Sequence, residues 1–428
     1  MKKVGVAILG LGVVGGGTYK ILTEHREEYK KAHNVDIVVE NVLELREERA
    51  LALGVEESKI ADNIAVICSN PEVDIVVEVM GGVEPARTFV LDALNAGKSV
   101  VTSNKEMYCK CSHELEKAAK KNHVGLFYEA TCGGGIPIIR ALLDNLQGNI
   151  ITSMMGIING TTNFILTKMS RDGVSYEDVL KEAQALGYAE ANPKNDVEGY
   201  DTMYKLSILS SLAFHTKIPY TKIYREGITG ISVKDINFGK QLGYVMKLLA
   251  IGKNEGSGIE VRVHPSFIKA DHPLASVNDS YNAVYLTGDS VEDVMLYGRG
   301  AGALPTGSAI VGDVIYCATH VNFPYSTFKN TEDAAPSTKF ISNFSSAYYI
   351  RINACDKAGV LAKVTAIFSR NGISVSQMVQ EEECNEDGTL PIIFITHKTK
   401  EHNVNKAVDE INATSDIAKV AAVVRVVS

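Results

Sequence analysis

The residues of this chain with the most obvious chemical potential lie between positions 183 and 205, in the stretch AQALGYAEANPKNDVEGYDTMYK. Glu190, Asp196 and Asp201 precede Lys205 in what we expect to be a loop that leads into a helix. Carboxylates in such a cluster could hold a substrate ammonium while the lysine passes a proton. The same pattern also fits an acidic helix N-terminus with an Asp201–Lys205 ion pair one turn apart. The residue types alone leave both interpretations open.

A glycine-rich turn near the N-terminus indicates a dinucleotide site. The turn reads GLGVVG, follows an apolar strand and opens a helix. Glycines in this context allow a tight turn and a close backbone approach to a pyrophosphate, which meets the helix N-terminus. The alternative, a glycine turn in an unrelated α/β protein, is weakened by the acidic residue after the second strand. The candidate cofactor-binding residues of the turn are Gly10, Gly12, Val13, Val14 and Gly15.

Residues at the end of the second strand bear on which dinucleotide is bound. Glu44 could accept hydrogen bonds from ribose hydroxyls, which favours NAD. Arg46 and Arg49 are close enough in sequence to attract a 2′-phosphate, which favours NADP. We therefore expect NAD or NADP as the cofactor and leave the choice between them open.

A second candidate site follows the strand expected at 99–102. Ser103 and Lys105 stand at the carboxyl edge of this strand, where α/β sheets bind ligands, so both are candidates for contact with the cofactor. A lysine at a strand end is more often simply solvated, and the residue type by itself favours that interpretation.

The elements that must position these residues fall into three groups. Residues 1–135 alternate apolar strands with amphipathic helices, which predicts a Rossmann-type NAD(P)-binding domain with a parallel sheet. In residues 136–320 the pattern changes, and we expect an α+β substrate-binding and dimerisation domain. Residues 321–346 are expected to be a linker, because this stretch is polar and has no sustained period. Residues 347–428 should follow as a separate module.

Periodicity predicts individual elements within these groups. In the first domain we expect strands at 4–9, 37–43, 75–79, 99–102 and 126–128 and helices at 18–31, 87–96 and 115–121. In the C-terminal module we expect strands at 348–354, 374–380, 391–396 and 420–427 and helices at 359–371 and 403–413. The βαββαβ order of the module is the ferredoxin-like arrangement.

Composition narrows the class of protein. The chain has 428 residues, 45% of them hydrophobic and 22% charged, which indicates a globular protein with more than one core. A formal net charge of -8 without a basic face argues against a nucleic-acid partner. No apolar run is long enough to predict a membrane span. Seven cysteines without CxxC spacing are typical of reduced thiols, so we expect a soluble, cytoplasmic protein.

Four blocks in the same order resemble the homoserine dehydrogenase family. The stretch 183–205 matches the family signature, and the other blocks are Glu129–Pro137, Gly156–Asn163 and Gly298–Thr306. Together with the glycine-rich turn, the likeness covers residues 1–320. The resemblance implies an NAD(P)-dependent oxidoreductase that interconverts L-homoserine and L-aspartate 4-semialdehyde in threonine, methionine and isoleucine biosynthesis.

The resemblance also implies roles for matching residues. Lys205 matches the family's proton donor, and Lys105 matches its second essential lysine near the nicotinamide. A hydride would pass from the nicotinamide to the aldehyde carbon while Lys205 donates a proton to the oxygen. The matching substrate-binding residues are Thr161, Glu190, Asp196 and Asp201, and Gly302 matches a cofactor contact in a late segment that packs back on the nucleotide domain.

A structural sodium or potassium ion is implied as well. In similar enzymes main-chain oxygens at the positions of Glu129, Cys132, Gly134 and Ile136 hold this ion. Cys132 departs from the usual valine, which leaves a carbonyl ligand intact but puts a thiol beside the active site. Leu43 departs from an arginine that meets the 2′-phosphate in many relatives, so a strong preference for NADP is in doubt.

The C-terminal module resembles an ACT domain, on the basis of DKAGVL at 356–361 and NGIS at 371–374. The resemblance implies an amino-acid effector, threonine, bound where the first helix begins, and assembly into a homodimer or homotetramer. A module that only dimerises is the alternative. The candidate regulatory residues are Asp356, Gly359, Val360, Asn371 and Ile373.

Two other functions remain as alternatives to a homoserine dehydrogenase. A catalytically silent amino-acid sensor could keep both ligand-binding modules, but the presence of Lys105, Lys205 and Asp201 together weighs against it. An ACT-bearing dehydrogenase of 2-hydroxy acids would require a catalytic histidine and arginine, and His215 instead suits a core or helix-end position.

Overall fold

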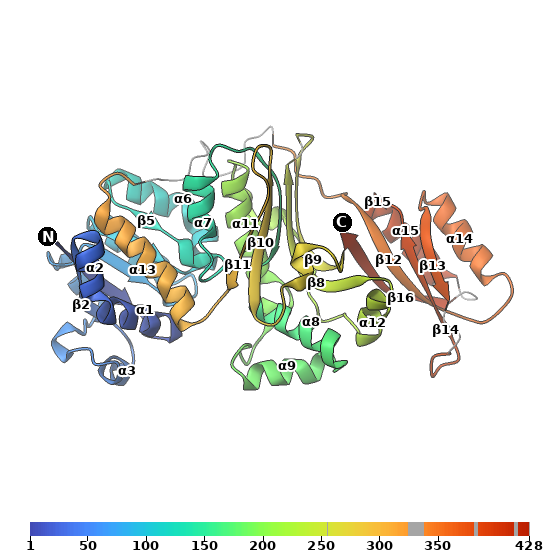
Figure 1. Cartoon of the computed structure of the whole chain (residues 1–428), viewed down its shortest axis with the longest axis horizontal. Helices are drawn as coiled ribbons and strands as arrows, with labels where there is room; N and C mark the ends of the chain where they lie inside the picture. Colours follow the sequence, from blue (N-terminus) through green and yellow to red (C-terminus); the bar gives the residue numbers. More distant parts are fainter. Residues whose placement is uncertain (255, 324–337, 381–383, 415–417, 428) are drawn as a thin grey trace.

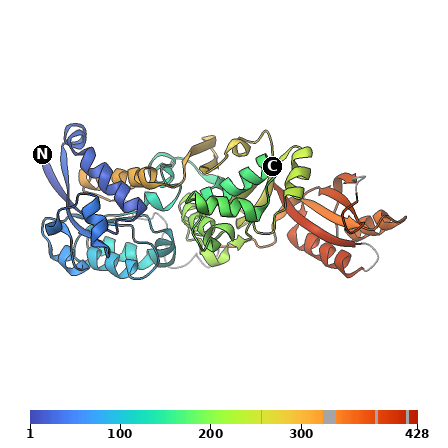
Figure 2. The ribbon, with the colours of Figure 1, turned by 90° about the horizontal axis from the view of Figure 1, so that it is seen from below.

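The computed structural model describes residues 1–427 apart from 255, 324–337, 381–383 and 415–417. Figure 1 shows three parts in a row along the longest axis, with the N-terminal part at one end and the C-terminal part at the other. Figure 2 shows the same row from below. Most of the expected linker at 321–346 lies outside the described residues. No helix of the described chain has the length and apolar character that a membrane crossing requires.

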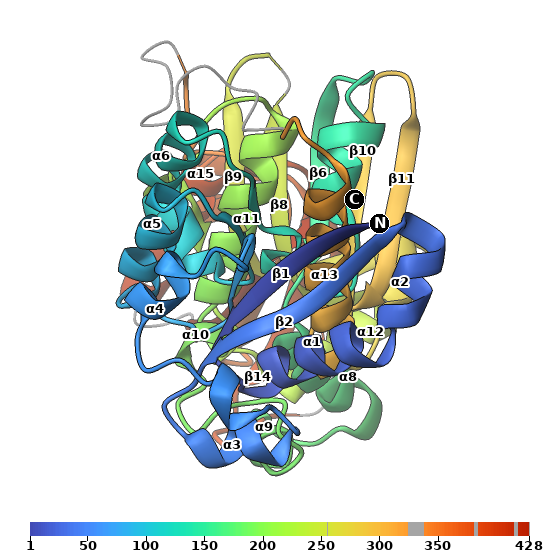
Figure 3. The same cartoon turned by 90° about the vertical axis from the view of Figure 1, so that its left-hand side faces the viewer.

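The N-terminal part is built on a parallel sheet ordered β2-β1-β3-β4-β5, which confirms the predicted Rossmann-type architecture. Its strands are β1 (Lys2–Leu9), β2 (Val35–Leu43), β3 (Ile75–Glu78), β4 (Ser99–Thr102) and β5 (Leu126–Phe127). The helices are α1 (Val13–Glu24), α2 (Arg26–His33), α3 (Glu47–Ala52), α4 (Ile64–Ser69), α5 (Ala86–Asn95) and α6 (Lys105–Lys121). Figure 3 shows α4, α5 and α6 on one side of β1 and β2, and α1 on the other.

Two helices of this part differ from their predicted bounds. The helix expected at 18–31 begins earlier, at Val13, and is interrupted at His25, whose backbone leaves the helical region. The helix expected at 115–121 begins at Lys105. The early part of each helix contains residues of low helix propensity that obscure the helical period, namely Gly15–Gly17 in α1 and Cys109 and Cys111 in α6.

The central part combines a mixed sheet with the helices that cover it. Its strands follow the order β11-β10-β6-β8-β9, and a short β7 pairs with β9. The strands are β6 (Ile151–Ile157), β7 (Tyr224–Arg225), β8 (Tyr244–Asn254), β9 (Ile259–Lys269), β10 (Tyr281–Gly288) and β11 (Glu292–Arg299). The helices are α7 (Ile138–Arg140), α8 (Gly160–Asp172), α9 (Tyr176–Ala185), α10 (Lys194–Val197), α11 (Tyr200–Ala213), α12 (Val233–Gln241) and α13 (Ala303–Thr319).

Helix α13 leaves the central part and packs against α1 of the nucleotide part, as Figure 1 shows. Ile310, Val311 and Val314 of α13 belong to the same buried apolar cluster as Val6 and Ile8 of β1. The two parts therefore share a hydrophobic core, and the start of α13 is held against α1, where a Cβ at Gly17 would lie 2.2 Å from the Ala303 carbonyl oxygen.

The C-terminal part has the predicted ferredoxin-like topology, with antiparallel strands ordered β16-β12-β14-β13. Its strands are β12 (Ser345–Ala354), β13 (Val375–Gln380), β14 (Leu390–Thr396), β15 (Thr399–Lys400) and β16 (Ala418–Val427), and its helices are α14 (Val360–Arg370) and α15 (Glu401–Ala413). The sheet does not stop at the module boundary. Strand β16 pairs in parallel with β9, so the central and C-terminal sheets are continuous.

Buried ion pairs reinforce this junction. Arg351 of β12 donates two hydrogen bonds to Asp235 of α12, at 2.6 and 3.0 Å, and the Tyr349 hydroxyl donates a third at 2.9 Å. Arg425 of β16 pairs with Glu226 of the central part and with Glu401 of its own module. These contacts hold the C-terminal module directly against the central part.

Candidate active site

The glycine-rich turn has the shape that a bound pyrophosphate requires. Gly10 adopts a φ of 95° and its amide donates to the Leu43 carbonyl at 2.8 Å. A Cβ at Gly15 would lie 2.0 Å from the Gly10 carbonyl oxygen, so only glycine allows α1 to approach the turn this closely. Helix α1 begins after Gly12 without a side-chain cap, which leaves its first amides available to an anion.

Glu44 lies against the same turn. One carboxylate oxygen of Glu44 accepts a hydrogen bond from the Leu11 amide at 2.6 Å, and the other accepts from the Arg46 amide at 3.1 Å. The carboxylate therefore stands at the end of β2 beside the turn, where the ribose of a dinucleotide would be expected.

The centre of the candidate active site is Asp201, which bridges two lysines. Its Oδ1 lies 3.0 Å from Nζ of Lys105, and its Oδ2 accepts from Nζ of Lys205 at 2.7 Å. Lys205 also donates to the Ile158 carbonyl at 2.8 Å. Lys105 is the first residue of α6, whereas Asp201 and Lys205 lie one turn apart on α11. Lys105 is therefore paired with a carboxylate, although its side chain remains 39% exposed.

Asn159 links this centre to Asp196. Its Nδ2 donates to Asp196 Oδ1 at 2.7 Å and to Asp201 Oδ2 at 2.9 Å, and its Oδ1 accepts from the Thr162 amide at 2.8 Å as the cap of α8. Asn159 belongs to the block Gly156–Asn163, and no role for it was predicted from the sequence. The signal that could have found it is an asparagine directly before a helix.

Burial and neighbouring charges shift the pKa values of three residues in the cluster. Burial by itself would raise the pKa of Asp201, but the neighbouring Lys105 and Lys205 ammonium groups outweigh burial and hold this pKa well below its usual range. The Asp201 carboxylate in turn raises the pKa of Lys105. Burial and the Asp201 charge raise the pKa of Asp196. Lys105, Asp201 and Lys205 therefore form a cluster of ion pairs that is already in place without substrate.

The remaining predicted substrate residues are placed differently from one another. Thr161 lies in the first turn of α8, buried, and its hydroxyl donates to the Tyr188 carbonyl at 2.6 Å. Glu190 is on the exposed loop between α9 and α10, and among the described residues no hydrogen bond or ion pair joins its carboxylate to the lysine cluster. Of the predicted substrate residues, the structure therefore brings Asp196 and Asp201 together and leaves Glu190 apart.

Two predicted cofactor residues lie at the ends of neighbouring elements. The Ser103 amide donates to the Glu78 carbonyl at 3.3 Å, directly before Asn104, which caps α6 through the Met107 amide. Gly302 is the last residue before α13 and has a φ of 126°. Both residues thus border helices that start next to the nucleotide sheet.

The predicted cation loop is tightly bound to its surroundings. The Glu129 carboxylate accepts from the Ile139 and Arg140 amides at 2.8 and 2.6 Å, and the Glu129 amide donates to Asp313 at 3.0 Å. Burial and the nearby Asp313 charge raise the pKa of Glu129 to about 7. Burial raises the pKa of the Cys132 thiol to about 12, so the reactive thiolate is disfavoured. No group of three or more His, Cys, Asp or Glu side chains in the described part of the chain is arranged to hold a metal ion.

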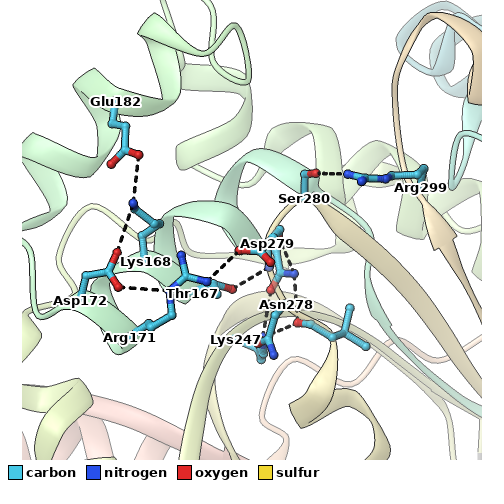
Figure 4. A network of polar contacts seen from close by, with 12 residues as sticks. Thr167, Lys168, Arg171, Asp172, Glu182, Lys247, Asn278, Asp279, Ser280 and Arg299 are labelled. Atoms are coloured by element: carbon cyan, nitrogen blue, oxygen red, sulfur yellow. Dashed lines mark hydrogen bonds and ion pairs between the residues drawn. The ribbon is translucent and has the colours of Figure 1, made fainter.

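A polar network fixes the far side of α8, which carries Asn159 at its start. Asn163 donates to the carbonyls of Val277, Asp279 and Tyr281 at 3.1, 2.9 and 3.1 Å. Lys247, which is 1% exposed, donates to the Asn163 side chain at 3.2 Å. Figure 4 shows Lys247 beside the loop of Asn278 and Asp279, with Arg171 reaching the same loop.

We expect the stability contributed by Lys247 to depend on pH. Burial lowers the pKa of Lys247 to about 8, although Asp279 opposes this shift. In the unfolded chain the Lys247 side chain keeps its proton up to about pH 10.4. Between the folded and the unfolded pKa the unfolded state therefore binds more protons than the folded state, and the free energy of unfolding rises with pH. The free energy of unfolding of the wild type, relative to Lys247→Met, should increase by about 2 kcal/mol from pH 8 to pH 10 in denaturant titrations. The control is Lys253→Met, on the same strand but half-buried. If the free energy of unfolding of the wild type changed with pH by the same amount relative to either variant, the expectation would be contradicted.

The candidate regulatory turn surrounds a cavity of about 230 Å³ at the start of α14. Asp356, Gly359 and Val360 line this cavity together with Gln380 and Leu390. Gly359 precedes α14 with a φ of 91° and no side-chain cap.

The other two candidate regulatory residues lie at the far end of α14. Asn371 ends the helix and donates to Ile367 O and to Glu410 of α15, at 3.0 and 3.1 Å, and Ile373 is buried. Asn371 and Ile373 therefore contribute to the packing of the module, whereas Asp356, Gly359 and Val360 line the cavity.

Comparison with known proteins agrees with this geometry. The family model for homoserine dehydrogenase matches residues 137–315, the model for the homoserine dehydrogenase NAD binding domain matches residues 10–129, and the model for the ACT domain matches residues 348–416.

Similar proteins span the whole chain. A homoserine dehydrogenase of Bacillus subtilis (strain 168) is 37% identical over 429 residues, covering 100% of this chain and 99% of the relative, and one of Neisseria gonorrhoeae is 38% identical with the same coverage. The crystal structure of a homoserine dehydrogenase from Thiobacillus denitrificans is 40% identical with a TM-score of 0.93, covering 100% of this chain and 99% of that chain. A hyperthermophilic archaeal homoserine dehydrogenase in complex with NADPH is 29% identical with a TM-score of 0.62, covering 74% and 97%. The chain therefore belongs to the homoserine dehydrogenase family of NAD(P)-dependent oxidoreductases and carries an ACT domain at its C-terminal end.

Proposed function

We propose that this enzyme interconverts L-homoserine and L-aspartate 4-semialdehyde with NAD or NADP. The observation that carries the proposal is Asp201 held between the ammonium groups of Lys105 and Lys205, at 3.0 and 2.7 Å. Lys105 follows β4 at the same carboxyl edge of the parallel sheet as the glycine turn that follows β1. Homoserine dehydrogenases of similar sequence along the full chain support the same substrate pair.

Lys205 is suited to donate the proton. An ammonium group has three donors, and Lys205 uses two of them on Asp201 and on the Ile158 carbonyl, which leaves the third for a substrate oxygen. When bound, the nicotinamide supplies or accepts the hydride. In the direction of aldehyde reduction, Lys205 would protonate the oxygen on which negative charge develops, and Lys105 would stabilise that charge.

The amino end of the substrate needs carboxylates. Asp196 is already part of the Asn159 bridge, and Glu190 on its exposed loop would join once the substrate ammonium is present. Thr161 would line the same pocket from the start of α8. These groups would hold the aldehyde carbon in a fixed position, which contributes to the rate through orientation.

The test of this proposal is the initial rate of NADH and NADPH oxidation with aspartate 4-semialdehyde. Turnover with one or both nucleotides is the expected result. The Glu44 carboxylate beside Leu11 and the apolar side chain of Leu43 predict no strong preference for NADPH. If the protein bound nucleotide but oxidised neither NADH nor NADPH, the result would favour the catalytically silent amino-acid sensor instead.

A monovalent cation, sodium or potassium, would fit the loop of Glu129, Cys132, Gly134 and Ile136. In the described chain the buried carbonyls of Cys132 and Gly134 accept no hydrogen bond, whereas those of Glu129 and Ile136 accept one each and retain a lone pair. The expected result is a higher midpoint of thermal unfolding, Tm, in NaCl or KCl than in choline chloride at the same ionic strength. Equal midpoints would argue against the ion.

We propose threonine as the effector of the ACT domain, bound with its carboxylate at the free amides of α14. Ala358 lines the cavity, so Ala358→Asp places a negative charge where the carboxylate would bind and should abolish inhibition by millimolar threonine without changing the basal rate. Ala362→Asp, exposed and four residues later, does not line the cavity and should leave inhibition intact. If the addition of threonine changed neither the rate nor the Tm of the wild type, this assignment would be contradicted.

The wider setting follows from the proposed reaction. Homoserine and its aldehyde would place the enzyme in threonine, methionine and isoleucine biosynthesis, in the cytoplasm, as a homodimer or homotetramer. Its binding partners would be small molecules, with neither nucleic acid nor membrane among them.

A further inference from the structure

Asn282 of β10 is a buried polar side chain that the mechanism above does not use. Asn282 is 0% exposed, and neither its Oδ1 nor its Nδ2 has a hydrogen-bond partner among the described residues. Its neighbour Tyr281, by contrast, is held through its carbonyl by Asn163 of α8. Asn282 therefore carries an amide that the folded chain encloses without satisfying it.

The amide lies between two segments that border the candidate active site. A Cβ at Gly300 would be 2.0 Å from Cγ and Nδ2 of Asn282, so the Gly298–Gly302 turn runs directly over the amide. On the other side, a Cβ at Gly160 would be 3.6 Å from Asn282 Oδ1. Gly160 opens α8 directly after Asn159, and the Gly298–Gly302 turn opens α13. The Asn282 side chain thus occupies the contact between these two helix starts.

Such an amide weakens the fold unless it acquires partners. A buried amide without hydrogen bonds loses its hydration and gains nothing in return, whereas leucine of similar volume would not incur this loss. Stability alone therefore gives no reason for asparagine at this position. The nearest candidate partners are main-chain groups of the two glycine-containing segments, which lie beside the Asn282 side chain but form no hydrogen bond with it among the described residues.

We propose that Asn282 is a positioning residue that fixes the distance between the two halves of the active site. In the enzyme loaded with nucleotide and substrate, the Asn282 amide hydrogen-bonds the main chain of the Gly298–Gly302 turn and of the first turn of α8, directly or through one water. The first segment belongs to the nucleotide side, and the second continues from Ile158 and Asn159, which contact Lys205 and Asp201. The inference rests on the proposed hydride transfer, because only a reaction between these two sides is sensitive to their separation.

The test compares Asn282→Leu with Asn282→Ser in the assay with aspartate 4-semialdehyde. Asn282→Leu should have a Tm equal to or above that of the wild type, KM values for nucleotide and substrate within twofold, and a kcat at least tenfold lower. Asn282→Ser keeps a hydrogen-bonding group, so it should retain more of kcat than the leucine variant despite a lower Tm. The control is Leu286→Ala, further along β10 and buried, which should lower Tm and leave kcat near the wild-type value.

The outcomes separate this inference from the function on which it rests. A leucine variant with wild-type kcat, or a serine variant slower than the leucine variant, overturns the positioning role. If the wild type itself does not turn over aspartate 4-semialdehyde, the proposed function fails first and the inference fails with it.

Discussion

Replacing Lys205 with methionine is expected to lower kcat by about 10³-fold, with KM for the nucleotide nearly unchanged. Methionine keeps most of the length of the side chain but has no proton to donate. Lys205 is 8% exposed and makes short contacts with Asp201 and the Ile158 carbonyl, so solvent cannot easily replace its ammonium group. The measurement is steady-state kinetics in both directions, together with Tm to show that the variant is folded.

The control for this variant is Lys194→Met, which removes a positive charge from exposed α10, close in sequence to Asp196. Lys194→Met should retain kcat within a factor of about 2, because a solvated surface charge contributes little at a distance. If Lys205→Met kept near-normal turnover, the proton would have to come from another group, and Lys105 would be the next to test.

The second large effect is expected for Asp201→Asn, which should lower kcat/KM by about 10²-fold. The carboxamide is similar in shape, but it leaves Lys105 and Lys205 as two ammonium groups with no anion between them. Their repulsion should displace Lys105, which is the more exposed of the two. Breaking a buried pair of this kind should also cost about 3 kcal/mol of stability.

The pH dependence of the Asp201→Asn effect has a definite sign. Because the pKa of Asp201 is held below its unfolded value, its contribution to stability is fully present above about pH 4 and is lost as pH falls through the lower folded value. The stability difference between wild type and Asp201→Asn should thus be constant from pH 5 to pH 8 and shrink in stronger acid. Since Asp201 raises the pKa of Lys105, the alkaline limb of kcat/KM against pH should move to lower pH in the variant. Unchanged pH profiles and kcat/KM would mean that Asp201 does not organise the lysines.

Local sequence patterns predicted the parallel sheet, the glycine turn and the βαββαβ module correctly. Strand and helix periods depend on residues a few positions apart, and so does the turn at Gly10, where the glycine pattern fixes a left-handed backbone. The four blocks likewise assigned the family before any geometry was known. Those patterns did not separate the two interpretations of Lys105, because exposure at a strand end depends on what packs opposite it.

Local patterns and the four blocks were sufficient to assign the fold class, the family and the glycine turn, and they supplied the candidate residues of the active site. Three features could be read from the folded chain alone: Lys105 of α6 pairs with Asp201 of α11, Asn159 joins Asp196 to Asp201, and β16 extends the central sheet through β9. The structure also separated Glu190 from the cluster and enclosed Asn282 between Gly160 and Gly300. This difference arises because periodicity and turn preference act between neighbours in sequence, whereas ion pairs, strand registers and buried amides depend on distances between segments that only packing brings together.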